Sequence, residues 1–218
     1  MITYPPAPWQ LQGKALCTLQ WVNSEKAALL VPKELEIISF WGKKTVGSVY
    51  LSLYGSGSTL EYSELIIAPA MVRYQGKIGA WISHIYVDNP QSLAGGKEMW
   101  GLPKEMANFS WSQGENLQQI TVSQNEKMLI CFTSQSSKRG LSTWGNVTLK
   151  GGCFGLVYPQ FVYFTNQFQS KMKQVNSEFT IPQESPFAQL ELNKPLFTVE
   201  MPNLKLTAGQ PENISSLS

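Results

Sequence analysis

The sequence predicts a mainly β protein, an antiparallel and closed or nearly closed β-barrel with a few short helices. Polar and apolar residues alternate along Thr45–Tyr54, which is typical of a half-buried strand. About a dozen such runs follow one another between turn residues, and 43% of the 218 residues are hydrophobic, enough for a sizeable core. Because closure removes exposed strand edges, so many short strands favour a barrel.

The segments between the turns define the expected order of elements. An extended arm over residues 1–13 comes first, since this stretch is rich in proline and aromatic residues. The β-type runs that follow are Ala15–Trp21, Leu35–Trp41, Thr45–Tyr54, Leu60–Val72 and Lys77–Val87. Those of the second half are Asn108–Ser112, Leu117–Val122, Met128–Ser134, Val147–Leu149, Phe161–Thr165, Ala188–Leu192 and Leu196–Leu206. The polar residues 210–218 are expected to fray, and residues 1–218 are expected to form one domain, because neither a repeat nor a linker divides them.

Two short helices are predicted in the first half of the chain. Ser24 can cap a helix over the next six residues, which ends before a proline. Asn89 can cap a second helix with a proline at its first position, where the missing N–H costs nothing. That helix is expected to run from Gln91 to Lys97 or Trp100 and to stop at the glycine that follows. Its two internal glycines weaken it, so packing must hold it.

Scarce residue types exclude several kinds of active site. The single histidine, His84, and the single aspartate, Asp88, lie in one expected strand and thus ~13 Å apart, too far for a Ser-His-Asp relay. One histidine cannot complete a common zinc set, and the cysteines show no CxxC spacing, so neither a metal nor another cofactor is expected. The three cysteines are expected to be reduced core thiols: Cys17, Cys131 and Cys153.

Charge and apolar patterns restrict the partners. A net charge of +2, with no basic cluster longer than Lys43–Lys44, provides no footprint for nucleic acid. The longest apolar run, Leu65–Val72, is far shorter than the ~20 residues of a membrane helix. The first ten residues show no secretory signal, so a cytoplasmic protein is expected. The apolar arm, which includes Tyr4 and Trp9, is expected to dock on a neighbouring copy and to produce a homo-oligomer.

One stretch resembles the signature of a known family. Residues Asp88–Lys104 read DNPQSLAGGKEMWGLPK: an Asp-Asn pair, a short helix with Gly-Lys-Glu, and a final Pro-Lys pair. This order is similar to that of acetoacetate decarboxylases, and the resemblance implies a β-barrel in which Lys104 is the Schiff-base residue. Residues Tyr62–Leu65 (YSEL) are similar to the family's second-site segment, which implies that Glu64 faces the substrate as an acid/base or orienting group. The substrate-binding positions that the resemblance implies are Lys14, Tyr62 and Trp100.

The residues around Lys104 suit this chemistry. A lysine amine is protonated at neutral pH and becomes a nucleophile when it is desolvated or crowded by another cation, as is known for acetoacetate decarboxylase. The sequence neighbours of Lys104 are apolar: Met99, Trp100, Leu102 and Met106. An imine formed between such a lysine and a β-keto acid accepts the electrons that are released with CO2.

Three positions depart from the family pattern. Glu105 stands where true decarboxylases have a second lysine. Near the amine it would keep Lys104 protonated, whereas on a strand it would point to the opposite face. Lys14 takes the place of a substrate-binding arginine, and Val49 that of a second active-site glutamate. Weak or absent decarboxylation of acetoacetate is therefore expected.

Further segments are similar to a plant chloroplast group of the same superfamily that is linked to the xanthophyll neoxanthin. These segments are the Pro-Pro-x-x-Trp of the arm, Gly13–Leu16, Val31–Glu34, Glu64–Leu65 and Gly101–Pro103. One hypothesis is therefore a Schiff-base-forming lyase-type enzyme, a decarboxylase or aldolase/dehydratase, that acts on a small keto acid or related carbonyl compound. The alternative is a non-catalytic β-barrel that binds an apolar or isoprenoid/carotenoid-like ligand. A purely structural protein with a filled barrel is the third.

Overall fold

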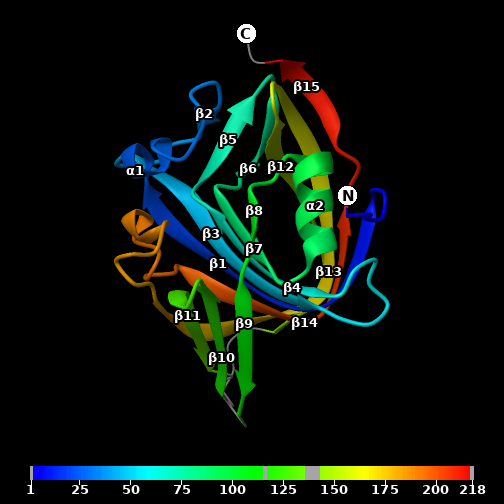
Figure 1. The fold of residues 1–218 in the computed structure, drawn as a ribbon. Coiled ribbons are helices and arrows are strands. Elements are labelled where there is room, and N and C mark those ends of the chain that lie inside the picture. Colours follow the sequence, from blue (N-terminus) through cyan, green and yellow to red (C-terminus); the bar gives the residue numbers. More distant parts are fainter. Residues whose placement is uncertain (1, 115–116, 136–142, 217–218) are drawn as a thin grey trace.

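A sheet of fifteen strands dominates the structure (Figure 1). The computed structural model describes residues 2–114, 117–135 and 143–216. The strands are β1 (Trp9–Asn23), β2 (Glu36–Ile37), β3 (Lys44–Tyr54), β4 (Tyr62–Ala68), β5 (Ala70–Tyr74), β6 (Lys77–Trp81), β7 (His84–Val87), β8 (Lys104–Met106), β9 (Asn108–Gln113), β10 (Leu117–Gln124), β11 (Lys127–Gln135), β12 (Thr143–Val157), β13 (Gln160–Thr180), β14 (Phe197–Ala208) and β15 (Glu212–Ser216). The helices are α1 (Ser24–Ala28), α2 (Pro90–Trp100) and the 3-10 helix η1 (Ala188–Leu190). None of the helices in the described ranges has the length and apolarity to cross a membrane.

The sheet follows the order β2-β5-β6-β12-β13-β14-β1-β3-β4-β7-β8. Strands β9, β10 and β11 branch from β13 and form the lower extension in Figure 1. Within the described part of the chain, only β6–β12 and β7–β8 pair in parallel. Within the described residues the terminal strands β2 and β8 are not paired with each other, so hydrogen bonds do not close the sheet. The mainly antiparallel β fold is confirmed, whereas the closed barrel is not.

Two of the expected strands are each interrupted and form two shorter strands. The run Leu60–Val72 forms β4 and β5 with Pro69 between them, because proline has no N–H for a ladder. The run Lys77–Val87 forms β6 and β7, since the chain leaves its partner β5 and crosses to β4. Of the run Leu35–Trp41, only the two residues of β2 pair in a strand.

The two ends of the chain pair more extensively than predicted. Trp9 pairs with Ala208, so the arm ends before β1 and not at residue 13. The expected fraying of the C-terminal tail is wrong for Glu212–Ser216, because β15 pairs with β13 and thereby satisfies backbone groups. The rest of the arm contacts its own chain: the hydroxyl of Tyr4 donates to Oε2 of Glu98 on α2 at 2.6 Å. The homo-oligomer through this arm stays a prediction.

Local chemistry corrects three further boundaries. Asn23, not Ser24, caps α1, since its Oδ1 accepts two backbone N–H groups of the first turn. Residues Ala188–Leu192 do not form a strand; η1 covers the first three of them, and Glu191 caps its end with a left-handed φ of 52°. Strands β12 and β13 extend far beyond the short apolar runs expected. Gly152 interrupts the apolar pattern, and a Cβ there would lie 2.6 Å from the backbone oxygen of β6.

Side chains of the sheet pack in two clusters, one on each face of β3 and β4. The packed cluster, as we call it, includes Val49, Leu51, Leu65, Ile67 and Phe132. The cavity cluster includes Trp9, Tyr50, Tyr54, Tyr62 and Trp100. Since successive side chains of a strand point to opposite faces, β3 and β4 contribute alternate residues to each cluster.

Candidate functional site

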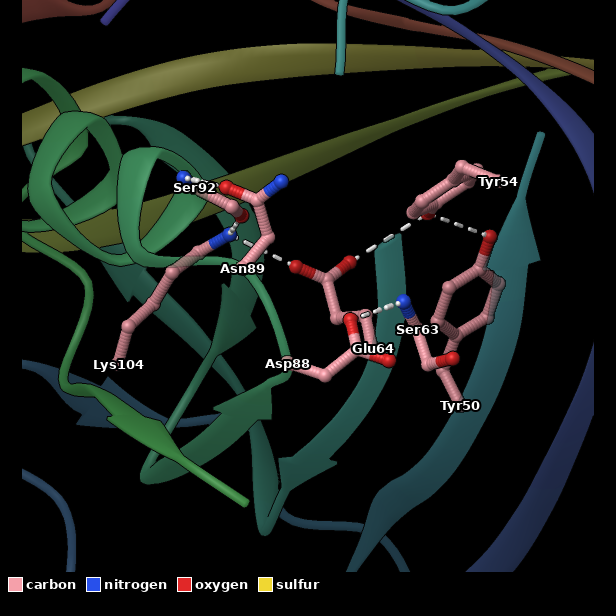
Figure 2. A network of polar contacts seen from close by, with 8 residues as sticks. All are labelled: Tyr50, Tyr54, Ser63, Glu64, Asp88, Asn89, Ser92 and Lys104. Carbon is pink, nitrogen blue, oxygen red and sulfur yellow. Dashed lines mark hydrogen bonds and ion pairs between the residues drawn. The ribbon is translucent and has the colours of Figure 1, made fainter. Parts of the chain in front are cut away.

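Lys104 and Glu64 form a buried ion pair in the cavity cluster (Figure 2). Lys104 is 2% exposed and Glu64 5%. Nζ of Lys104 donates to Oε1 of Glu64 at 2.8 Å and to Oγ of Ser92 at 2.9 Å. Buried charges persist only when they are paired and hydrogen-bonded, and both conditions hold here. The structure thus brings together the two residues that the sequence predicted as catalytic.

Helix α2 positions Ser92 and leaves room for the lysine. Oδ1 of Asn89 caps the helix by accepting from the N–H groups of the first turn, as predicted, and Gly101 ends it in a left-handed conformation. Gly96 faces the stem of Lys104, where a Cβ would lie 2.4 Å from Cδ. The helix-weakening glycine therefore allows the lysine to pass close to the helix.

Two side chains before α2 tie the helix to β4. Oδ1 of Asp88 accepts from the backbone N–H of Ser63 at 2.7 Å (Figure 2). Nδ2 of Asn89 donates to the backbone oxygen of Glu61 at 3.2 Å. Ser63 directly precedes Glu64, so these contacts hold the carboxylate and the start of α2 in one arrangement. The Asp-Asn pair of the motif has this structural role.

Two tyrosines continue the polar network from Glu64. The hydroxyl of Tyr54 donates to Oε2 of Glu64 at 3.4 Å, and it lies 3.1 Å from the hydroxyl of Tyr50 (Figure 2). Burial raises the pKa of Tyr50 above the ordinary value of 10. The pKa of Tyr54 is also raised well above 10, chiefly by burial and further by the nearby Tyr50 and Glu64. Both phenols therefore stay protonated at neutral pH and can donate hydrogen bonds.

Two aromatic rings flank the amine. Nζ of Lys104 lies 5.1 Å from the ring centre of Tyr62 and 5.8 Å from that of Trp9, within the range of cation–π contacts. The ring of Trp9 reaches this position beside Gly95, where a Cβ would lie 2.7 Å from it. The edge of Trp100 meets Trp9 at a centroid distance of 4.8 Å. The aromatic wall thereby shields the ion pair from solvent.

The ion pair lies in the wall of a cavity of about 340 Å³. Among the described residues that line it, Lys104 and Glu64 alone are charged. Buried lining residues surround the pair: Trp9, Tyr54, Tyr62, Trp100 and Leu102. Other lining residues are half-buried, from which we infer that the cavity opens beside them: Leu19, Ser48, Met71, Ala80 and Phe168. The cavity is thus mainly apolar, with its charged groups in the buried part.

The predicted substrate-binding residues do not all meet here. Tyr62 and Trp100 line the cavity. Lys14 instead lines a separate groove together with Pro202 and Lys205, and its Nζ lies 5.0 Å from the ring centre of Trp111. The alternation of β1 explains the difference, because Lys14 does not share a face with the cavity-lining Cys17.

Two of the departures from the family pattern have structural explanations. Glu105 points away from the amine and is exposed, with Oε2 accepting from Nε2 of Gln124 at 2.8 Å. Val49 belongs to the packed cluster, so an acid at that position would not face the cavity. Neither position therefore adds charge around Lys104.

Sequence reasoning missed Ser92, Tyr50, Tyr54 and Trp9 as members of the site. The polar face of β3, with Tyr50 and Tyr54 two positions on either side of Ser52, was a signal that could have found the tyrosines. Cys17 and Cys153 line the cavity and are half-buried rather than fully buried core thiols. Desolvation raises the pKa of each thiol to about 12, so both stay protonated. The described residues contain no group of three or more His, Cys, Asp or Glu side chains arranged to hold a metal ion.

The site is thus a buried amine–carboxylate pair in the wall of a mainly apolar cavity, within a mainly antiparallel sheet. The family model for acetoacetate decarboxylase (ADC) matches residues 1–151, more than half of the chain, so the chain belongs to the acetoacetate decarboxylase family. This result confirms the resemblance seen in the sequence.

Individual relatives extend the comparison. The chain is 26% identical over 139 residues to the protein NEOXANTHIN-DEFICIENT 1 of Oryza sativa subsp. japonica, which covers 64% of this chain and 45% of that protein. The chain spans less than half the length of the curated plant relatives that it matches. In fold it is similar to acetoacetate decarboxylase from Legionella pneumophila, with a TM-score of 0.79, 16% identity, and coverage of 99% and 90% of the two chains. It is also similar to the enduracididine biosynthesis enzyme MppR complexed with pyruvate, with a TM-score of 0.71, 16% identity, and coverage of 100% and 93%.

Proposed function

We propose that the chain is a Schiff-base-forming lyase-type enzyme that acts on a small keto acid or a related carbonyl compound. Lys104 is the nucleophile, Glu64 exchanges protons with it, and Tyr62 and Trp100 form part of the wall around the substrate. The buried pair supports this most strongly: Nζ of Lys104 lies 2.8 Å from Oε1 of Glu64 in the wall of an apolar cavity. A volume of about 340 Å³ is within the range of small-molecule sites.

The first step moves a proton within the pair. A protonated amine has no electron pair with which to attack a carbonyl. Transfer of one proton from Lys104 to Glu64 converts an ammonium and a carboxylate into a neutral amine and a carboxylic acid. The transfer needs no solvent, since the two groups are already hydrogen-bonded. Apolar surroundings favour the neutral pair relative to water.

The second step forms the imine. The amine of Lys104 adds to the substrate carbonyl carbon, and one amine proton passes to the carbonyl oxygen. Glu64 then returns its proton to the resulting hydroxyl, which leaves as water. The products are a protonated imine on Lys104 and a carboxylate on Glu64, so the cavity regains the charge pair with which it began.

The third step uses the protonated imine as an electron acceptor. The bond between the substrate's α-carbon and its leaving group breaks, and its electron pair forms an enamine. The leaving group is CO2 in a decarboxylase, or an aldehyde in an aldolase after Glu64 accepts the hydroxyl proton. The α-carbon then takes a proton, from Glu64 in the aldolase or from water in the decarboxylase, and hydrolysis of the regenerated imine releases the product and restores the amine. Membership of the acetoacetate decarboxylase family supports this sequence of steps.

Reductive trapping tests the proposal. Cyanoborohydride should reduce an imine formed with acetone to a stable secondary amine, and peptide mapping should locate the adduct on Lys104. Lys104→Met should abolish that adduct, whereas Lys14→Met is the matched control because Lys14 lies in a separate groove. An unmodified Lys104 in the wild-type protein, or an equal adduct in Lys104→Met, would refute the role of Lys104.

Non-catalytic binding of an apolar ligand is the second candidate function. The apolar wall of the cavity favours it, as does the similarity to a protein named NEOXANTHIN-DEFICIENT 1. Nile red, an uncharged fluorophore, should then bind wild type and Lys104→Met equally. Equal binding, with no adduct on wild-type Lys104 in the trapping experiment, would favour this function over catalysis.

A further inference from the structure

The charges of the cavity restrict the substrates that fit it. Apart from Lys104 and Glu64, the described lining residues are apolar or neutral. The two opposite charges neutralise each other through a 2.8 Å contact. None of the described lining residues is an arginine, and Lys14, the other cation expected near the substrate, lines a different groove. The wall among the described residues therefore offers no spare cation to a substrate carboxylate.

A carboxylate would be unpaired at the key stage of the reaction. Once the imine forms, its positive charge faces the negative charge of Glu64 and the pair is complete. A keto acid would then add a second negative charge beside Glu64, and the neutral donors of the wall, such as Tyr50, Tyr54 and Asn166, carry no positive charge to compensate it. Burying a charge without a partner is strongly unfavourable, and two adjacent carboxylates repel each other. A neutral aldehyde or ketone adds no such charge.

The shape of the cavity favours a substrate that carries an apolar chain. The ion pair is buried, whereas Leu19, Met71 and Phe168 are half-buried where the cavity opens. A carbonyl group at Lys104 would therefore direct the rest of the molecule along apolar side chains toward the opening. At ~30 Å³ for each water-sized group in a liquid, about 340 Å³ holds roughly eleven non-hydrogen atoms.

We propose that the substrate is a neutral aldehyde or ketone with an apolar chain of roughly ten carbons, and not a free keto acid. This inference rests on the proposed Schiff-base function and narrows it to one substrate class. It also accounts for the expected weak activity on acetoacetate, because acetoacetate is a small anion with no apolar chain.

Competitive trapping at Lys104 tests the substrate class. The two probes are 2-nonanone and 2-oxooctanoate, which are similar in size and differ in the carboxylate, and acetone is the small neutral probe. Each probe is incubated with the protein and cyanoborohydride, which reduces any imine to a stable amine. Peptide mapping then quantifies the adduct on Lys104 relative to the adducts on exposed lysines. We expect 2-nonanone to modify Lys104 at least about tenfold faster than 2-oxooctanoate, with acetone between them.

The outcomes separate the two proposals. Equal or faster modification by 2-oxooctanoate overturns the neutral-substrate inference but supports the Schiff-base function. If acetone is the only probe that modifies Lys104, the inference of a substrate with an apolar chain is overturned, whereas the Schiff-base function is still supported. An absence of adduct on Lys104 with all three probes overturns the Schiff-base function itself.

A change at the opening provides a second test. Met71 is a half-buried lining residue, and Met71→Arg introduces a cation on a side chain of similar length. Met71→Gln is the matched control, since it is polar but uncharged. If a missing cation excludes keto acids, Met71→Arg should increase modification by 8-oxononanoate, whose carboxylate lies at the far end of the chain toward the opening, about tenfold relative to Met71→Gln and should not increase that by 2-nonanone. Equal rates in both variants would contradict the charge argument.

Discussion

Neighbouring residues of β4 point into two different regions, the packed cluster and the cavity. Leu65 and Ile67 are fully buried in the packed cluster. Tyr62 and Glu64 are buried in the wall of the cavity, and Ile66 is half-buried there. The two-residue period of a strand is the physical cause of this separation. The comparison shows how one strand can stabilise the fold with one face and present buried polar and charged side chains to a cavity with the other.

The largest effect on the cavity face is expected from Glu64→Gln. Glutamine preserves the size of the side chain but cannot accept the proton of Lys104, so trapping of acetone at Lys104 should slow by ~10²–10⁴. Glu61→Gln is the matched control, because Glu61 is exposed just before β4. Peptide mapping over time measures both rates. A change of less than about tenfold would mean that the cavity face does not need this carboxylate.

Glu64→Gln also leaves the buried lysine without its carboxylate. Removal of one partner of a buried ion pair commonly costs ~3–5 kcal/mol in unfolding free energy. Denaturant unfolding of the variant should therefore accompany the kinetic measurement, and trapping should be compared under conditions in which the variant is folded. Restored unfolding stability in the double variant Glu64→Gln/Lys104→Met would identify the unpaired charge as the cause.

The packed face is expected to control stability. Leu65→Ala should lower the unfolding free energy by ~2–5 kcal/mol, because it leaves a void among fully buried side chains. Ile66→Ala is the neighbouring control on the cavity face, and its cost should be smaller because Ile66 already borders open space. Denaturant unfolding measures both. An equal or larger cost for Ile66→Ala would erase the distinction between the two faces.

The smallest expected effect is on the unfolding free energy at alkaline pH. The folded-state pKa of Tyr50 is raised above its ordinary value of 10, so above pH 10 the unfolded chain releases the proton and the folded chain keeps it. The stability contributed below pH 10 is then lost as the pH rises, by up to about 1.4 kcal/mol per pH unit for one tyrosine. Tyr50→Phe should reduce this slope in denaturant titrations between pH 9 and 11, and the exposed Tyr158→Phe is the control. An unchanged slope in Tyr50→Phe would contradict the assigned cause.

The sequence predicted the buried pair of Lys104 and Glu64 better than it predicted the rest of the site. The gapless motif that ends at Lys104 and the acid at Glu64, directly before the apolar run Leu65–Val72, are local signals, and both residues lie in the cavity. Ser92 and Tyr54 reach the pair only through the packing of α2 and β3, which local patterns do not encode. Lys14 was assigned by analogy with one position of a family, and the face of β1 on which it lies separates it from the cavity.

The fold shows the same limit. Strand type and the capping of α2 by Asn89 follow from local residues, and both are confirmed. The length of β13, from Gln160 to Thr180, follows from pairing with distant strands rather than from its own apolar pattern. Closure of the barrel also depends on which distant edges meet, and the described strands β2 and β8 do not.

Exchange of carbonyl oxygen measures the central claim, reversible imine formation on Lys104, most directly. Imine formation expels the carbonyl oxygen as water, and hydrolysis installs an oxygen from the solvent. Wild-type protein should therefore replace the ¹⁸O of labelled 2-nonanone with solvent oxygen, as followed by mass spectrometry, while Lys104→Met should leave the exchange at the rate of the protein-free solution. Equal exchange by wild type and Lys104→Met would contradict the account.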